Sequence, residues 1–429
     1  MKLHIEKEVY GGAGLARQQN GDGAGRTIFV PFTLPGETVE VALASGKGGF
    51  GEAELIEVLD PSPHRVKPRC VHFGTCGGCQ YQHADYAAQV GIKATLLSEI
   101  LQHAGLHSLP DAQVHTADQW FYRNRSQLRL EEVGGVLRAG YNRRGSNEFC
   151  PIQECPVLAP LLWRATEAVI QIAKENSAVG RWLHGADLVE LFTDATETKL
   201  QMSFFAKKDQ KGFDDVCETL VKSVPELAGV GAFLLSPQRK MSRSIGSWRA
   251  EGLNYQVAEE RYWVSRGGFF QVNRFLVDEL LEIVTSGRKG NLAWDLYAGV
   301  GLFSRGLAQT FGQVVAVEAV ASDLQKTFKG AGKRAVEANT VDFLRGAVVQ
   351  RDRPDLIVMD PPRAGVGREV CTLLARLSAA EIVYVSCDPV TLAADLKMLV
   401  EAGYHVAELH MIDLFPQTFH LESVVILRK

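Results

Sequence analysis

The last third of the chain alternates short apolar runs with stretches of helical periodicity, and this alternation limits the possible folds more than any other feature. The runs are Leu292–Leu296, Val314–Val317, Leu356–Met359 and Ile382–Ser386. Short continuous apolar runs are typical of parallel strands that helices cover on both faces. From about residue 266, the sequence therefore predicts a doubly wound α/β domain whose ligand lies at the carboxyl ends of the strands.

The first 60 residues show the alternation of apolar and polar residues that short β-strands have. Four such segments are His4–Tyr10, Thr27–Phe32, Thr38–Ala44 and Glu52–Leu59. The turns GGAG, NGDGAG, LPG and SGKGGFG are rich in Gly, and this spacing predicts a small β-barrel. The segment has five Lys and Arg against nine Asp and Glu. Its charge argues against a purely electrostatic grip on a phosphate backbone.

A Pro-rich stretch at 61–68 (PSPHRVKP) separates this segment from a central region of mixed strands and helices. We expect domains at 1–60, 61–265 and 266–429. Apolar residues at helical spacing predict a helix at 85–105 that ends at Gly105 and is a candidate for docking on the C-terminal domain. These residues are Val90, Ala94, Leu97, Leu101 and Ala104.

Five of the eight cysteines lie between residues 70 and 155. Cys70, Cys76 and Cys79 form a CVHFGTCGGC segment, and Cys150 or Cys155 would complete a set of four ligands. Zinc sites usually use paired CxxC motifs, and there is no second pair, so four single Cys ligands fit an iron–sulfur cluster better. Cys217 and Cys371 fall in helical patterns and are expected to be packing residues.

The sequence WDLYAGVGLF at 294–303 indicates a strand that enters a Gly turn. Asp295 suits a cationic ligand better than a pyrophosphate, and Glu318, after the next strand, suits the two ribose hydroxyls of a nucleoside. A dinucleotide-binding turn would have Gly where Ser304 stands. The pattern therefore favours S-adenosylmethionine. The segment DPPR at 360–363 ends another strand and faces the same crevice.

Cys387 follows the strand at Ile382–Ser386 and therefore borders that crevice. A helix is expected from about Val390, and a helix N-terminus lowers the pKa of a nearby thiol. A thiolate there could add to C6 of uracil, so that C5 becomes nucleophilic enough to accept a methyl group. The C5 proton must then leave, and the candidate base near the last strand is Glu422. Without further context, Glu422 would be a solvated acid.

Composition excludes disorder, collagen and coiled coil as the main architecture of the chain. The chain of 429 residues has 46% hydrophobic and 22% charged residues, which is typical of globular domains. A net charge of −4 gives no overall signature of a nucleic-acid binder.

Six arginines and only two glutamates lie at 121–145, interleaved with Phe121, Tyr122 and Tyr141, and this segment is the expected RNA contact. We expect a soluble cytoplasmic monomer that binds neither DNA nor a membrane.

Several motifs together resemble the RNA uracil-C5 methyltransferases, and the likeness extends over nearly the whole chain. They are CVHFGTCGGCQYQH, QECPVLAP, FFQVN, DLYAGVGLF, DPPRAG, VYVSCDP and FPQTFHLES. The family implies a multidomain α/β fold with a small N-terminal β-barrel of the TRAM (OB-like) type and a central α+β domain that holds a 4Fe–4S cluster. It also implies a C-terminal Rossmann-like class I methyltransferase domain that uses S-adenosylmethionine.

The resemblance also implies residue roles. It places the cluster on Cys70, Cys76, Cys79 and Cys155, because the family's fourth cysteine precedes a segment like PVLAP. It makes Cys387 the nucleophile and Glu422 the base. The implied cofactor contacts are Gln271, Tyr297, Glu318 and Asp360. The segment between Glu318 and Asp342 is shorter and more irregular than is usual in the family, so the resemblance does not specify the adenine contact, and Asn339 is the candidate for it.

The expected activity is the methylation of uridine C5 in RNA, with 23S ribosomal RNA as the first expected substrate and transfer RNA as the second. A cytosine-C5 enzyme would usually have a Pro-Cys nucleophile or a second catalytic cysteine, and Ser386 precedes Cys387 here. The non-catalytic alternative is an iron–sulfur RNA-binding or assembly factor. The presence of both Cys387 and Glu422 argues against it.

Overall fold

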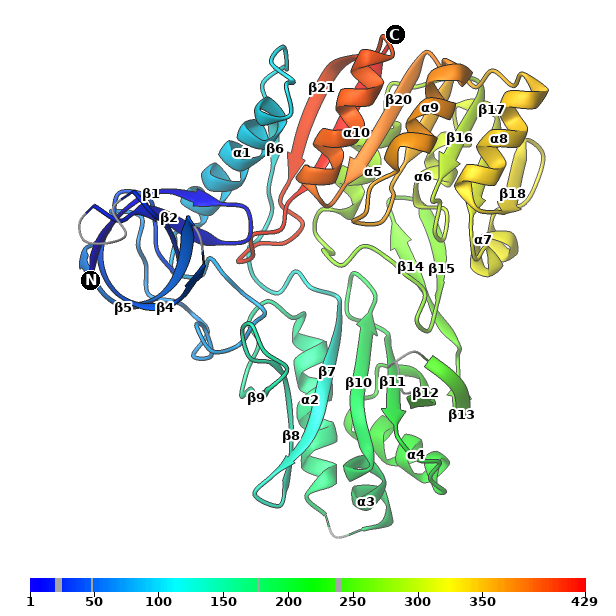
Figure 1. Cartoon of the computed structure of the whole chain (residues 1–429). Helices are drawn as coiled ribbons and strands as arrows, with labels where there is room; N and C mark the ends of the chain where they lie inside the picture. The colour runs from blue at the N-terminus through cyan, green and yellow to red at the C-terminus, as the bar shows by residue number, and fades with distance from the viewer. Residues whose placement is uncertain (20–24, 48, 176, 236–240) are drawn as a thin grey trace. The chain divides into compact units, whose positions relative to one another are not determined.

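The computed structural model describes residues 1–19, 25–47, 49–175, 177–235 and 241–429. The chain forms two compact units. Figure 1 shows the whole chain, with colours that run from the N-terminus to the C-terminus. Unit 1 comprises residues 1–103, 142–150 and 415–421, and unit 2 comprises 104–141, 151–414 and 422–429. Most of the Gly-rich turn predicted at 20–25 and residue 48 of the turn at 45–51 lie outside the described residues.

Unit 1 begins with a closed five-stranded barrel in the order β1-β2-β3-β5-β4, which confirms the predicted small barrel. Its strands are β1 (Lys2–Val9), β2 (Ala13–Arg17), β3 (Thr27–Pro31), β4 (Thr38–Lys47) and β5 (Phe50–Asp60). The sequence did not predict β2, whose residues AGLAR have weak β propensity. This strand forms because it pairs along its length with β3 and with part of β1.

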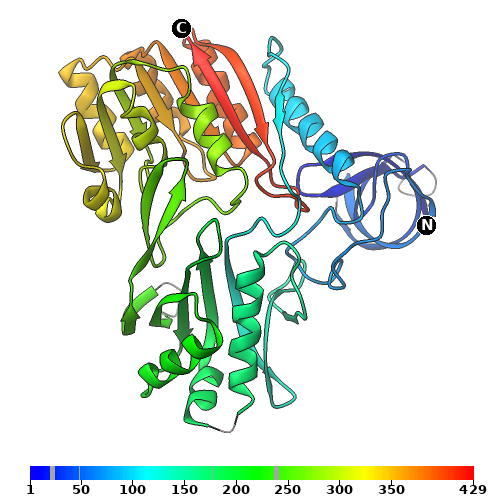
Figure 2. The ribbon, with the colours of Figure 1, turned by 180° about the vertical axis from the view of Figure 1, so that it is seen from behind.

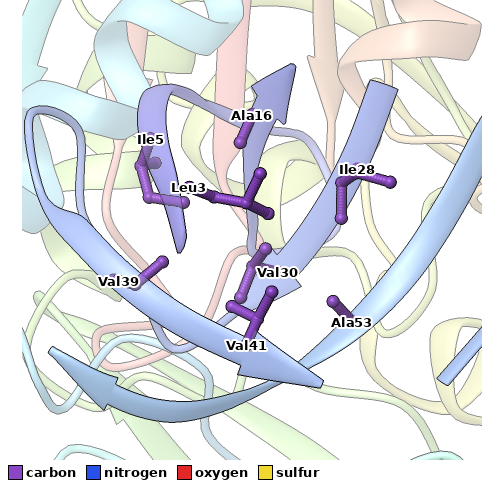
Figure 3. Close-up of a cluster of buried hydrophobic side chains, with 8 residues drawn as sticks. All are labelled: Leu3, Ile5, Ala16, Ile28, Val30, Val39, Val41 and Ala53. Carbon is purple, nitrogen blue, oxygen red and sulfur yellow. The ribbon is translucent and has the colours of Figure 1, made fainter. Parts of the chain in front are cut away.

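The barrel interior is filled by small and branched apolar side chains that come from all five strands (Figure 3). They are Leu3, Ile5, Ala16, Ile28, Val30, Val39, Val41 and Ala53. Alternate residues of each strand point inward, which is the period of two seen in the sequence. Each fully buried Val, Leu or Ile contributes about 1.5–3 kcal/mol, so this core stabilises a very small module.

The predicted helix is α1 (Tyr86–His103), and Gly105 follows it with a left-handed φ of 92°. Its buried side includes two polar residues. Gln89 exchanges hydrogen bonds with the side chain and backbone of Gln417, and Lys93 Nζ donates to the carbonyl oxygen of Phe415 at 3.0 Å. These bonds attach the segment 415–421 to α1 within unit 1. No helix among the described residues is long and apolar enough to cross a membrane.

Unit 2 contains a central sheet in the order β13-β12-β11-β10-β7-β8. Its strands are β7 (Arg125–Val133), β8 (Val136–Asn142), β10 (Ala186–Thr193), β11 (Leu200–Ala206), β12 (Leu227–Leu235) and β13 (Met241–Arg249). The short β9 (Phe149–Pro151) spans the boundary between the units. The helices of this part are α2 (Pro160–Ala173), α3 (Ala178–His184) and α4 (Phe213–Ser223), and the hairpin of β14 (Gly252–Val257) and β15 (Glu260–Ser265) follows.

The C-terminal part of unit 2 is an eight-stranded sheet in the order β18-β17-β16-β19-β20-β22-β21-β6. Its strands are β6 (Gln113–His115), β16 (Gly290–Leu296), β17 (Phe311–Glu318), β18 (Lys333–Glu337), β19 (Leu356–Met359), β20 (Glu381–Ser386), β21 (His405–Ile412) and β22 (Glu422–Arg428). The four apolar runs are β16, β17, β19 and β20, and they are parallel as predicted. Strand β22 is antiparallel to β20.

Helices cover both faces of this sheet. Figures 1 and 2, which view the molecule from opposite sides, show α8 to α10 on one face and α5 and α6 on the other. The helices are α5 (Val277–Thr285), α6 (Leu302–Leu307), α7 (Ser322–Thr327), α8 (Thr340–Gln350), α9 (Gly367–Leu377) and α10 (Pro389–Glu401). The segment expected to be irregular contains α7 and β18, which is parallel to β17 but has no fully buried residue. Its exposure explains why no apolar run indicated it.

Candidate active site

The register of β20 and β22 brings the predicted nucleophile and base together. Ser386, the last residue of β20, is paired with Ser423 across the antiparallel ladder. Continuing this register by one residue places Cys387 opposite Glu422. Side chains at opposed positions lie on the same face of a sheet, with their Cβ atoms about 4.5–5.5 Å apart. Two residues 35 positions apart in sequence thus become neighbours at one end of the sheet.

The charges around the Cys387 thiol oppose its ionisation. Burial, together with the carboxyl groups of Glu422 and Asp360, raises the pKa of Cys387 to about 11, although the Arg363 guanidinium opposes this rise. The sequence predicted a lowered pKa because a helix was expected from about Val390, and α10 does begin there, at Pro389. That prediction was wrong, since burial and the negative charges on neighbouring elements outweigh the effect of the helix terminus.

Glu422 is not the solvated acid that its sequence context alone suggested. The residue is only 3% exposed. Burial raises the pKa of its carboxyl well above the ordinary value, Asp360 raises it further, and Arg363 lowers it. A buried carboxyl of raised pKa accepts a proton more readily than an exposed one, which suits a general base.

Asp360 follows β19 and lies in the same charge cluster. Burial and the charge of Asp295 raise the pKa of its carboxyl. Gln271 Nε2 donates to Asp360 Oδ2 at 3.4 Å, and the Asp360 backbone N–H donates to the Leu296 carbonyl oxygen at 3.3 Å. The structure thus brings Gln271, Asp360, Glu422 and Cys387 together, and their roles in binding and catalysis stay predictions.

Asp295 is fully buried at the end of β16, and burial raises the pKa of its carboxyl to about 7. Its Oδ2 accepts a hydrogen bond from the Ser304 hydroxyl, while Oδ1 has no hydrogen-bond partner among the described residues. Ser304 stands where a dinucleotide fingerprint has Gly, so this departure from the motif was the sequence signal for its contact. A nearby positive charge stabilises a buried carboxylate, so an oxygen without a hydrogen-bond donor favours a cationic ligand.

The Gly turn after β16 is held in an unusual backbone conformation. Tyr297 has a φ of 63°, which is rare for a residue with a side chain, and Gly299 and Gly301 also have positive φ values. The Gly299 N–H donates to Glu318 Oε2 at 2.9 Å, and the Ala319 N–H donates to Glu318 Oε1 at 2.8 Å. Glu318 and Tyr297 therefore lie at adjacent strand ends, where the sequence placed them.

Asn339 has a structural role in the chain. It is the N-cap of α8, and its Oδ1 accepts a hydrogen bond from the Val341 N–H at 2.9 Å. This capping contact uses the side-chain oxygen. A contact of Asn339 with an adenine stays a prediction.

The cysteines of the first cluster lie in one loop of unit 1. Burial raises the pKa of the Cys76 thiol, and the charges of Cys150 and Cys70 raise it further, so these three thiols are near one another. Cys155 belongs to unit 2. Within the described ranges, no group of three or more His, Cys, Asp or Glu side chains is arranged to hold a metal ion. Cys217 and Cys371 are buried in α4 and α9.

Much of the arginine-rich segment supports the fold. Arg125 lies over the ring of Phe192 at 4.4 Å from its centroid, and it donates to the carbonyl oxygen of Gly268. Tyr122 is buried, and the hydroxyls of Tyr141 and Ser126 share a hydrogen bond of 2.7 Å. The Tyr122 ring is thus packed in the protein, whereas Phe121 and Tyr141 are half-buried, and RNA contact by this segment stays a prediction. Arg143 and Arg144 belong to unit 1, and Arg138 is exposed in unit 2.

Known proteins resemble this chain in sequence and in fold. Residues 340–429 match the family described as tRNA (Uracil-5-)-methyltransferase, and residues 1–56 match the TRAM domain. An uncharacterized RNA methyltransferase of Aquifex aeolicus is 32% identical over 100% of this chain and 98% of its own. A 23S rRNA (uracil(1939)-C(5))-methyltransferase of Pectobacterium atrosepticum is also 32% identical, over 97% of this chain and 90% of its own.

The chain belongs to the RNA uracil-C5 methyltransferase family. The first matched region contains Asp360, Cys387 and Glu422, and the second contains nearly the whole barrel. A tRNA (uracil-54, C5)-methyltransferase of Pyrococcus abyssi, solved with S-adenosyl-L-homocysteine, covers 100% of both chains with a TM-score of 0.76 at 21% identity. That likeness confirms the fold class of the family, with its small barrel and its methyltransferase domain.

Proposed function

We propose that this chain transfers the methyl group of S-adenosylmethionine to C5 of a uridine in RNA through a covalent adduct with Cys387. The register that sets Cys387 opposite Glu422 carries the proposal, because the reaction needs a nucleophile at C6 and a base at C5 of the same ring. The full-length similarity to an enzyme named for this reaction on 23S ribosomal RNA supports it.

The reaction begins when Cys387 loses its proton to solvent. A positive charge bound beside Asp360 and Glu422 favours this loss, because it offsets the carboxylates that hold the pKa of the thiol high. The thiolate then forms a bond to C6 of uracil, and the electrons of the C5–C6 double bond move to the ring as an enolate. The bound sulfonium compound supplies the methyl group to C5 and is left neutral.

Glu422 completes the cycle. Its carboxylate takes the C5 proton, the released electron pair restores the C5–C6 double bond, and the bond between C6 and Cys387 breaks. Thiolate and product are then free, and the proton on Glu422 returns to solvent. A target uridine inside a helix or loop would have to leave its stack to reach the thiol.

Five side chains from neighbouring strand ends and loops would hold the methyl donor. We assign Gln271, Tyr297, Glu318 and Asp360 to it, with Asn339 at the adenine. Asp295 near the end of β16 and Glu318 at the end of the neighbouring β17 lie on either side of the Gly turn, and this arrangement suits a nucleoside that carries a cationic amino acid. The second expected substrate, transfer RNA, is kept because the Pyrococcus enzyme of similar fold is named for it.

We also infer that Cys70, Cys76, Cys79 and Cys155 hold a 4Fe–4S cluster. Three cysteines within ten residues of one loop are a set of soft thiolate donors that suits iron–sulfur ligation. Bound there, the cluster would shape the RNA-binding region and take no part in methyl transfer. Cys150 is the competing fourth ligand because its charge reaches Cys76.

RNA that contains 5-fluorouridine tests the proposed chemistry. Fluorine at C5 cannot leave as a proton, so methylated RNA should stay attached to Cys387. Incubation with S-adenosylmethionine should give a protein–RNA band that survives denaturing electrophoresis, and Cys387→Ala should give none. A full-strength band from Cys387→Ala would contradict the assignment of the nucleophile.

A further inference from the structure

A buried carboxylate on α10 holds the loop that follows β19. Asp395 is 3% exposed and lies two helical turns beyond Cys387 in the sequence. Its Oδ2 accepts hydrogen bonds from the Val366 N–H at 2.8 Å and from the Tyr384 hydroxyl at 2.7 Å. Its Oδ1 accepts the Gly367 N–H at 3.0 Å. One carboxylate thus joins α10, strand β20 and the loop at 360–367.

The loop packs directly on this carboxylate. Gly365 has a left-handed φ of 71°, and a Cβ atom built there would lie 2.5 Å from Asp395 Oδ2. Its N–H donates to the Pro362 carbonyl oxygen at 2.9 Å, which closes a turn. A second tether comes from Thr391, whose hydroxyl donates to the carbonyl oxygen of Arg363 at 3.0 Å. The backbone around Arg363 is therefore fixed from both sides.

The same helix begins immediately after the nucleophile. Asp388 caps α10 and accepts the N–H groups of Val390 and Thr391, each at 3.0 Å. Because Thr391 and Asp395 lie on this helix, the distance between Cys387 and the loop depends on α10. Asp360, at the start of the loop, is anchored separately by the bonds to Gln271 and Leu296. Release of Asp395 should therefore move Arg363 and leave Asp360 in place.

We propose that Asp395 is a positioning residue that keeps the Arg363 guanidinium beside Cys387 and Glu422, an inference that rests on the proposed function of those two residues. Arg363 is the cation that opposes the negative charges around the thiol. Asp395 acts through the loop and touches neither the thiol nor the substrate. Its three hydrogen bonds explain why an acid is buried on a helix face that is otherwise apolar.

The substitution Asp395→Asn tests this role. The amide N–H₂ would face a backbone N–H, so at least one bond to the loop is lost. With Arg363 displaced, the pKa of the Cys387 thiol should rise. Iodoacetamide alkylation of Cys387, followed by peptide mass spectrometry between pH 7 and 10, should be roughly tenfold slower for each unit of that rise. The turnover number should fall in parallel, while KM for S-adenosylmethionine stays within about twofold because Asp360 is unmoved.

Asp194→Asn is the matched control. Asp194 is also a buried aspartate that accepts two backbone N–H groups, from Thr198 at 2.7 Å and Lys199 at 2.9 Å, in the central part of unit 2. The substitution Asp194→Asn should lower thermal stability without changing the alkylation of Cys387. In an Arg363→Ala background, Asp395→Asn should slow alkylation no further, because its effect passes through Arg363.

Three results would overturn the inference. They are an unchanged alkylation profile in folded Asp395→Asn, an equal effect of Asp194→Asn, and additive effects of Asp395→Asn and Arg363→Ala. If Asp395→Asn fails to fold, Thr391→Val removes the other hydrogen bond to the loop. This variant must also slow the alkylation of Cys387, by a smaller factor. Wild-type protein that alkylates as expected but methylates no RNA would defeat the proposed function and leave this measurement decisive for Asp395.

Discussion

Ser386 and Ser423 are direct partners across the antiparallel strands β20 and β22, and the Ser423 hydroxyl donates a hydrogen bond to the Ser386 carbonyl oxygen at 3.2 Å. The residue after Ser386 is Cys387, and the residue before Ser423 is Glu422. This single pairing, the last of the ladder, therefore brings the proposed nucleophile and base next to each other. Because register errors in a sheet move by whole residues, the geometry is either kept or lost completely.

The substitution Glu422→Gln should separate the two halves of the reaction. A neutral amide cannot take the C5 proton, so turnover should fall about 100-fold to 10,000-fold, the usual contribution of a general base. The adduct with Cys387 should still form and should accumulate, which quench experiments with denaturing electrophoresis would detect. Full activity without an accumulated adduct would show that another group is the base.

Binding of S-adenosylmethionine should tighten as the pH rises from 6 to 8. Asp295, whose pKa burial raises to about 7, is largely neutral at pH 6 and ionised at pH 8, and only the ionised form attracts a cation. We expect a roughly threefold to tenfold gain in affinity by titration calorimetry. S-adenosylhomocysteine lacks the sulfonium charge and should show a smaller gain. In Asp295→Asn, the affinity for S-adenosylmethionine should depend less on pH. An unchanged pH dependence would show that Asp295 is not the group responsible.

The cluster assignment predicts different fates for two nearby cysteines. Protein purified without oxygen should be brown and carry about four irons. Cys155→Ser should lose the colour and most of the iron, whereas Cys150→Ser should keep both. Absorption spectra and iron analysis of the two variants decide the matter, and the reverse pattern would make Cys150 the ligand.

Glu8 in the barrel should make the free energy of unfolding depend on pH. Burial raises the pKa of its carboxyl to about 8, and neither oxygen has a hydrogen-bond partner among the described residues. The folded chain therefore keeps a proton that the unfolded chain loses near pH 4.5. Stability from this group is complete below that pH and is lost as the pH rises toward 8.

Glu8→Gln replaces the titrating carboxyl group by a neutral amide. The variant should gain on the wild type as the pH rises, by on the order of 1–3 kcal/mol at pH 8, and the gain should be small at pH 5. Thermal unfolding at both pH values measures it. Glu6→Gln, at an exposed position of the same strand, is the control and should show no such trend. An equal gain at pH 5 and pH 8 would contradict the buried, neutral state of Glu8.

The sequence predicted the parts of the fold that local patterns specify. Four apolar runs became β16, β17, β19 and β20, and the motif around Cys387 lies at a strand end as expected. Elements stabilised by distant partners were missed. Strand β6 is three residues long and has no apolar pattern, so only its pairing with β21 defines it.

The electrostatics of the site were the hardest part to predict. The expected low pKa of Cys387 rested on the helix that follows it, a local feature, whereas the groups that raise the pKa come from β22 and from the loop after β19. In the same way, Asp395 looks in sequence like an ordinary exposed acid within a helix. It is buried only because the loop at 360–367 folds over it.

The central claim is that Cys387 makes 5-methyluridine in RNA, and mass-spectrometric mapping of that base tests it most directly. A strain that lacks the gene should be rescued with wild type or with Cys387→Ala, and its 23S and transfer RNA compared. The account predicts that one or more 23S sites lose the methyl group and that only wild type restores it. Restoration by Cys387→Ala, or no change in either RNA on deletion, would contradict it.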